Sequence, residues 1–289
     1  MKKFILIYIM LSCIFAVSCG NTVENKKYKS YVCNMANDGI ISKFEKDWWT
    51  GKSVFDVSVE ERKAFLFKSD IYSAEYTFSR WAKNGPTRID YFYDKNQGAT
   101  LKFESSTGKF AGIHFDSLLT DEYISKQDKD NSYEYALDMA KRIATEYIDI
   151  DKYKFEHSQM TVPGVNENFE VILYMFEFTK YINDFKTSER VYINITSKGD
   201  LFTLNVSNIG LFDATHNIKI DKAALDDSVK LKLKDLYEDE YQYKYKIFGQ
   251  TLTYSPENVL TVISAIEVEL MTNESNVFHT GLELATVIE

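Results

Sequence analysis

The side chains able to do chemistry in this 289-residue sequence are few and widely spaced. The residues relevant to metal binding and nucleophilic catalysis are the thiols and imidazoles of Cys13, Cys19, Cys33, His114, His157, His216 and His279. No two histidines stand three or four positions apart, so the sequence offers almost no set of ligands for a zinc site. Gly-x-Ser-x-Gly, His-Glu-x-x-His, a phosphate-binding glycine loop and the dinucleotide fingerprint are absent from the sequence. We therefore expect no catalytic residues, no cofactor and no metal site.

Carboxylates are the remaining candidates for chemistry. The sequence has 43 of them, and a pair at the right separation could hydrolyse a glycoside, a three-dimensional property that the sequence leaves open. Asp128, Asp130 and Glu134 could offer oxygens to calcium, but a solvated loop leading into a helix explains them better. Twenty Tyr and twenty Phe could line a binding groove, although alternating aromatics more often form the buried face of a sheet.

The first eighteen residues have the pattern of a secretory signal peptide. Lys2 and Lys3 supply a positive start, residues 4–17 form a nearly unbroken apolar run, and the small Ser18 precedes Cys19. The apolar run is shorter than the roughly 20 residues that a membrane-spanning helix needs. We expect a signal peptide over residues 1–18, with cleavage between Ser18 and Cys19.

The segment Ala16-Val17-Ser18-Cys19-Gly20 resembles the bacterial lipobox, although the family pattern prefers Leu where Ala16 stands. The resemblance implies that the Cys19 thiol carries palmitate-like acyl chains, and two or more such chains hold a protein stably to a bilayer. The protein would then bind the lipid bilayer through Cys19, and it would be located at the extracytoplasmic face of either the outer or the plasma membrane. Lipidation at Cys13, after Leu11 and Ser12, and secretion without lipid are the alternatives.

Composition excludes some partners of the mature chain. The formal net charge is −9, and loss of Lys2 and Lys3 with the signal peptide makes it more negative. Nucleic acid and anionic lipid both require clustered positive charge, so neither is an expected partner of the folded body. With Cys13 removed and Cys19 acylated, Cys33 has no intramolecular disulfide partner, and we expect it to be buried and inert.

Local patterns predict an alternation of helices and strands. A capping box at residues 58–61 predicts a short helix through about Lys68. A sequence typical of β-strands begins at Ile71. A hairpin is expected about the turn at residues 105–109. The clearest helix begins at Asn131 or Ser132 and carries an apolar stripe of Ala136, Ala140, Ile143 and Tyr147. Strand-like runs follow at residues 153–155, 169–181, 191–195 and 201–206, then a helix at 221–237, then runs at 241–248, 259–270 and 277–288.

The order of these elements repeats, with two helix starts and two hairpin glycines each about 90 residues apart. We predict an α+β fold of tandem units, each a helix on an antiparallel sheet, with two units indicated strongly and a third compatible with the pattern. The expected boundaries are a tether over 19–57 and units over 58–130, 131–215 and 216–289. Chance alternation in an α+β fold is the alternative to duplication.

A family resemblance agrees with these units. Residues 101–109, ending in Thr107-Gly108-Lys109, resemble the strand and turn of PepSY-type domains; residues 131–150 resemble the helix of the next module, and residues 191–206 repeat the strand–turn–strand ending. The similarity covers roughly residues 71–289. It implies PepSY-like or cystatin-like modules that bind or inhibit an envelope protein or peptidase without catalysis. It supplies no site residues.

The sequence therefore predicts a membrane-tethered, extracytoplasmic lipoprotein that acts as a non-catalytic binding or inhibitory module for an envelope protein. One alternative is a lipid-anchored hydrolase of envelope polymer, which would need a cleft with two carboxylates. The other is a solute-binding lipoprotein that serves a transporter, which would need a deep pocket between two lobes.

Overall fold

The computed structural model describes residues 27–35, 61–81, 86–116, 118–124, 132–163, 170–213, 218–238, 241–255, 257–271 and 277–289. The expected signal peptide, the expected cleavage site at Ser18 and the expected lipidation site at Cys19 all lie outside the described residues. So do most of the expected tether and the candidate calcium ligands Asp128 and Asp130.

Strands dominate the described residues. They are β1 (Tyr28–Met35), β2 (Arg62–Phe67), β3 (Asp70–Trp81), β4 (Arg88–Asp94), β5 (Ala99–Glu104), β6 (Phe110–Phe115), β7 (Lys154–Pro163), β8 (Glu170–Ile182), β9 (Phe185–Thr196), β10 (Leu201–Ser207), β11 (Gln242–Tyr254), β12 (Leu260–Met271) and β13 (Val277–Ile288). The helical elements are α2 (Asp121–Ile124), α3 (Tyr133–Ala144), the 3₁₀ turn η1 (Ile150–Lys152) and α4 (Lys222–Tyr237).

All thirteen strands of the described residues belong to one sheet, which runs β1-β13-β12-β11-β9-β10-β6-β5-β4-β3-β2, with β8 on β9 and β7 on β8. The pairing of β9 with β11 is parallel and the other described pairings are antiparallel. The α+β fold of tandem helix-on-sheet units was therefore wrong, because the molecule is β-rich and built on one large mixed sheet. Continuing the sheet satisfies backbone groups that separate units would leave at their edges.

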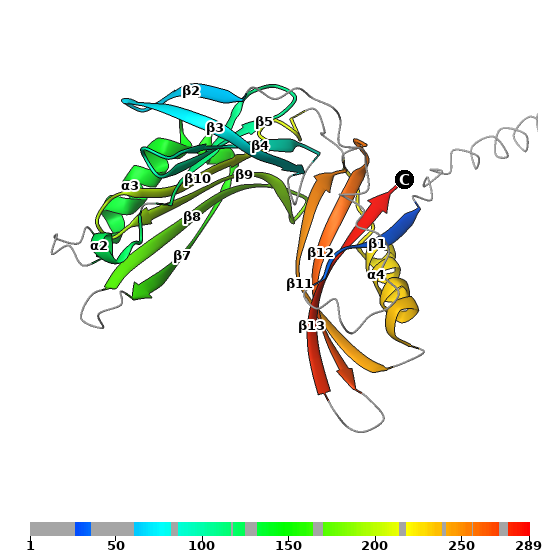
Figure 1. The fold of residues 1–289 in the computed structure, drawn as a ribbon. Coiled ribbons are helices and arrows are strands. Elements are labelled where there is room, and N and C mark those ends of the chain that lie inside the picture. The colour runs from blue at the N-terminus through cyan, green and yellow to red at the C-terminus, as the bar shows by residue number, and fades with distance from the viewer. Residues whose placement is uncertain are drawn as a thin grey trace, which may run out of the picture.

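The sheet arches, and its two arms each carry one long helix (Figure 1). We call β2–β10 with α3 the large lobe, and β1, β11, β12 and β13 with α4 the small lobe. The two lobes are joined where β11 pairs with the start of β9, through Thr251 with Lys186 and Leu252 with Thr187. Within the described residues, no helix is both long and apolar enough to span a bilayer.

Both long helices begin where the sequence predicts. Ser132 caps α3, its hydroxyl accepting from the Tyr135 amide, and Asp221 caps α4 by accepting from the amides of Ala223 and Ala224. These caps satisfy backbone donors that a helix start otherwise leaves unpaired. The helix expected over residues 58–68 is wrong over its described part, because Arg62–Phe67 forms strand β2 and pairs with β3.

Both helices cover the same face of the sheet. In β9, Val191 and Ile193 pack beneath α3, and Phe185, on the same side of the strand by alternation, packs with Leu225 of α4. Leu252 of β11 belongs to that second cluster. The opposite side of the sheet, which carries neither α3 nor α4, is called the helix-free face below.

Candidate functional site

The helix-free face bears a hollow in each lobe. The one in the large lobe, here called the Lys102 hollow, has a volume of about 330 Å³. It is lined by Thr77, Phe78, Tyr91, Tyr93, Thr100, Lys102 and His114. The one in the small lobe, here called the Phe248 hollow, has a volume of about 430 Å³.

Strand alternation places the polar side chains of the Lys102 hollow. In β5, Leu101 and Phe103 are buried in the core beneath α3, so Thr100 and Lys102 emerge on the helix-free face. In β6, Ile113 enters the same core and His114 emerges beside Thr100. One covered and one uncovered face is the usual arrangement of an antiparallel sheet.

Lys102 is held in the hollow by a hydrogen bond. Its ammonium donates to Asn205 Oδ1 at 2.6 Å and lies 5.9 Å from the centre of the Tyr91 ring. Burial lowers the pKa of Lys102, the nearby Arg80 lowers it further, and Asp116 opposes both. Within the described part of the chain, Lys102 forms no ion pair with a carboxylate. Two of its three donors are therefore available to a ligand.

His114, on the neighbouring strand β6, also lines the Lys102 hollow. Its Nδ1 lies 2.8 Å from Thr203 Oγ1 and its Nε2 lies 3.2 Å from Asp116 Oδ1. The Thr100 hydroxyl donates to the other oxygen of Asp116 at 2.9 Å. Burial lowers the pKa of His114 and outweighs the raising effect of Asp116, so the imidazole is neutral near pH 7.

Aromatic rings make up the apolar part of the Lys102 hollow. Phe78 and Tyr91 stack with centroids 4.5 Å apart. The Arg80 guanidinium lies 5.0 Å from the centre of the Tyr91 ring, and its Nε donates to the Tyr91 hydroxyl at 2.9 Å. Tyr91 is buried, whereas Phe78 is 48% and Tyr93 37% exposed. The exposed rings offer flat apolar surface beside two cations.

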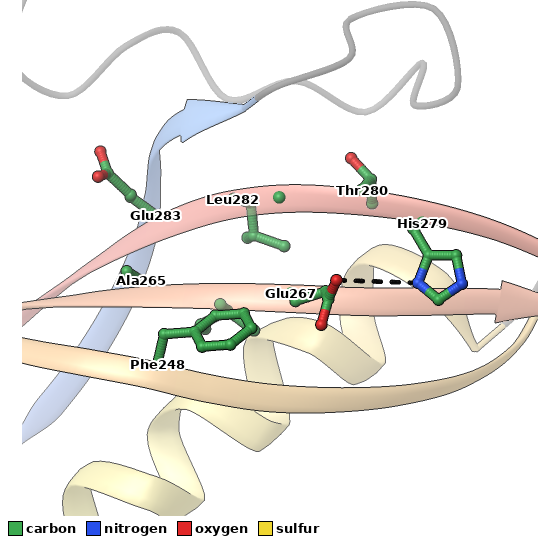
Figure 2. Close-up of a pocket in the computed structure, with 9 residues that line it drawn as sticks. Phe248, Ala265, Glu267, His279, Thr280, Leu282 and Glu283 are labelled. Carbon is green, nitrogen blue, oxygen red and sulfur yellow. Dashed lines mark ion pairs between the residues drawn. The ribbon is translucent and has the colours of Figure 1, made fainter. Parts of the chain in front are cut away.

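The Phe248 hollow carries acidic groups instead (Figure 2). Glu267 Oε1 lies 3.9 Å from His279 Nδ1, and Lys246 sits over the Phe248 ring at 4.8 Å. Figure 2 shows the Glu267 carboxylate directed toward His279 and the Glu283 carboxylate directed away from it. The two carboxylates of a glycosidase must flank the same bond, whereas those of Glu267 and Glu283 are not directed at one point (Figure 2).

Of the thiols and imidazoles singled out in the sequence, His114 lines the Lys102 hollow and His279 lines the Phe248 hollow. Ser18 and Cys19 lie outside the described residues. Cys33 is buried, as expected, and its thiol donates to the Glu283 carbonyl at 3.2 Å. Glu134 lies in the first turn of α3. Within the described ranges, no group of three or more His, Cys, Asp or Glu could hold a metal ion.

Sequence reasoning did not identify Lys102 and His114 as site residues. A signal was present, because polar Thr100 and Lys102 alternate with apolar Leu101 and Phe103, which marks a strand with one uncovered face. The partners could not be read in this way, since Asn205 lies 103 positions from Lys102 in the chain.

Comparison with known proteins adds little. No known protein family matches the sequence, and no curated protein matches it. Among solved structures, the chain is similar to an uncharacterised protein from Eubacterium rectale, with 11% identity over 73% of this chain and 72% of that one and a TM-score of 0.36. Similarity at this level carries no inference about fold or function, and the PepSY resemblance stays a prediction.

Proposed function

We propose that this chain is a non-catalytic binding module, tethered by lipid on Cys19 to the extracytoplasmic face of a membrane, that binds an envelope protein through its helix-free face. One observation carries the binding role: α3 and α4 cover the same side of a single sheet and leave the other side with two lined hollows. Exposed aromatic rings beside polar groups are characteristic of interaction surfaces. The tether rests on the lipobox-like sequence alone.

The geometry favours this function over the two alternatives. A solute-capturing lipoprotein would enclose its ligand in a deep pocket, whereas both hollows are open depressions on a sheet face. A polymer hydrolase needs two cooperating carboxylates, and Glu267 and Glu283 point apart (Figure 2).

The tether is tested by palmitate labelling and membrane fractionation of the full chain. Cys19→Ala should abolish labelling and release the protein from the membrane fraction, because acyl chains supply the anchoring free energy. Cys13→Ala and Cys33→Ala are matched controls and should keep both properties. Labelling that survives Cys19→Ala, or that is lost in Cys13→Ala, would refute the assignment of the lipid to Cys19.

The binding role is tested by site-specific photo-crosslinking in cells. A photoreactive residue in place of Thr77, on the helix-free face, should form covalent adducts with an envelope protein. The same residue in place of Arg142, on the exposed side of α3, is the control and should form none. Equal adducts from both positions, or none from Thr77, would contradict the proposal.

A further inference from the structure

The Lys102 hollow concentrates positive charge in a chain whose net charge is −9. Lys102 and Arg80 both approach the Tyr91 ring, at 5.9 and 5.0 Å from its centre. Neither forms an ion pair with a carboxylate among the described residues; Lys102 is bonded to the neutral Asn205 and Arg80 to the Tyr91 hydroxyl. A partly desolvated ammonium in the hollow and an exposed guanidinium beside it, both held by neutral acceptors, form a site for an anionic group.

The neighbouring groups limit how much negative charge the hollow can accept. Asp116 lies within Coulombic range of Lys102 and is bonded to Thr100 and His114. His114 is neutral near pH 7. Two cations and one carboxylate leave a net charge of about +1, which matches a carboxylate and not a phosphate dianion.

The apolar side of the hollow specifies what carries the charge. Phe78 and Tyr93 expose aromatic surface on the same side of the sheet as Lys102. A ring that stacks on such surface gains both apolar burial and aromatic contact. At about 330 Å³ the hollow has room for one small ring and its acid group, and not for an extended ligand.

We propose that the Lys102 hollow binds a carboxylate joined to an aromatic group, with the carboxylate on Lys102 and Arg80 and the ring against Phe78 and Tyr93. Either a free organic acid or the carboxyl end of a peptide carries this chemistry. The inference rests on the proposed binding function and names the group that the helix-free face recognises.

The test measures binding to the full chain in detergent micelles by isothermal titration calorimetry. The probes are 3-phenylpropionate, its uncharged alcohol, propionate and inorganic phosphate. We expect 3-phenylpropionate to bind at least tenfold more tightly than the other three, because only it has both the charge and the ring. Gly-Gly-Phe with a free carboxylate, against the same peptide as an amide, separates the two sources: tighter binding than 3-phenylpropionate, lost on amidation, assigns a peptide end.

Variants locate the site. Lys102→Gln should weaken 3-phenylpropionate binding at least tenfold, whereas Lys109→Gln, the same charge change in the exposed β5–β6 turn, should leave it unchanged. Phe78→Ala, at a 48% exposed position, should weaken binding of 3-phenylpropionate but not of propionate.

Equal effects of Lys102→Gln and Lys109→Gln would overturn the proposal, and so would tighter binding of phosphate or no binding of any probe. If no probe binds while Thr77 still crosslinks to an envelope protein, the ligand class is wrong and the binding function stands. If crosslinking also fails, both the ligand class and the proposed binding function are wrong.

Discussion

Gly112 shows how a residue without a side chain shapes the Lys102 hollow. Its φ of +152° is rarely adopted by other residues, and a Cβ there would lie 2.3 Å from the Leu204 carbonyl and 3.2 Å from Asn205 Oδ1. The missing side chain lets β6 approach β10 and leaves room for the amide that holds Lys102.

Gly112→Ala should therefore destabilise the protein by roughly 3 kcal/mol, the upper end of the range for overpacking, because backbone strain adds to the clash. Gly249→Ala is the matched control: nothing lies within 4 Å of its added Cβ, so its free energy of unfolding should change by less than about 1 kcal/mol. Urea denaturation measures both. Equal losses would show that the close approach of β6 and β10 has no energetic consequence.

Glu189 is a carboxylate buried at 1% exposure near the junction of the lobes. It accepts hydrogen bonds from the Tyr153 hydroxyl, the Phe212 amide and the Lys180 ammonium. Burial and this bond to Glu189 raise the pKa of Tyr153. The three donors together neutralise a charge that would otherwise be costly to bury.

Glu189→Gln should lower the free energy of unfolding by about 3 kcal/mol. The NH₂ group of the new amide would face hydrogen-bond donors, and Lys180 would lose this buried negative partner. Glu170→Gln, at the exposed start of β8, is the control and should lie within about 0.5 kcal/mol of the native protein. Chemical denaturation reports both values. A neutral result at Glu189 would mean that the three donors bind an amide oxygen as favourably as they bind the carboxylate.

At the scale of elements, β7 is an edge strand that pairs, among the described strands, only with β8. Charged groups reinforce this edge: Glu156 of β7 accepts from the Tyr181 hydroxyl at 2.8 Å and from Lys186 at 3.0 Å. These hydrogen bonds lower the pKa of Glu156. Burial raises the pKa of Glu177, but Arg190 and Lys186 outweigh burial, so this pKa is lowered as well.

A carboxyl whose pKa is lowered by folding stabilises the folded state fully above its unfolded pKa, near 4.5, and loses this contribution as the pH falls through the folded value. The amides of β7 and β8 should therefore lose hydrogen-exchange protection as the pH falls below about 4.5, relative to α4. Lys186→Met should reduce protection at pH 6 and flatten the pH dependence. Protection factors that fall equally in α4 would instead indicate global acid unfolding.

Local elements could be predicted from the sequence where the signal is local. Ser132 and Asp221 mark the starts of α3 and α4 because a cap acts over three residues. The segment Arg62–Phe67 was assigned to a helix because its capping-box pattern is also local, whereas the pairing with β3 that makes it a strand is not. Most strands after Ile71 were found by their composition, since β-branched and aromatic residues favour a half-buried pleated surface. Most of β7 was missed, because its residues are nearly all exposed and carry no alternating apolar pattern.

The arrangement of the elements could not be predicted in this way. Strands β6 and β10 were assigned to different units, yet Ile113 pairs with Leu204 in one sheet. Buried and exposed side chains alternate in the same way whether a strand lies at the edge of a small sheet or inside a large one. The alternation therefore does not reveal which strand is its neighbour. For the same reason Lys102 is recognisable in the sequence as a residue on an uncovered face, but not as a group held by Asn205.

At the scale of the whole molecule, the junction between the lobes is narrow in backbone pairing and reinforced by packing. Beyond the two residue pairs that join β9 to β11, Thr253 donates to the Ser188 hydroxyl at 2.9 Å. On the helix side, Phe185 of β9 packs with Leu225 of α4 and Leu252 of β11. Because apolar burial contributes far more than two hydrogen-bonded pairs, we expect this cluster to couple the lobes during unfolding.

Phe185→Ala should therefore separate the unfolding of the lobes. Phe185 is 4% exposed, and truncating such a buried ring costs about 3–5 kcal/mol of stability. Because the lost contacts are ones that the two lobes share, the single calorimetric transition should become two. The small lobe should melt first, because its sheet has fewer strands. Phe278→Ala, at a 42% exposed position in β13, removes the same group outside the junction and should keep one transition. A single transition in Phe185→Ala, shifted to lower temperature, would show that the continuous backbone of the sheet couples the lobes without this cluster.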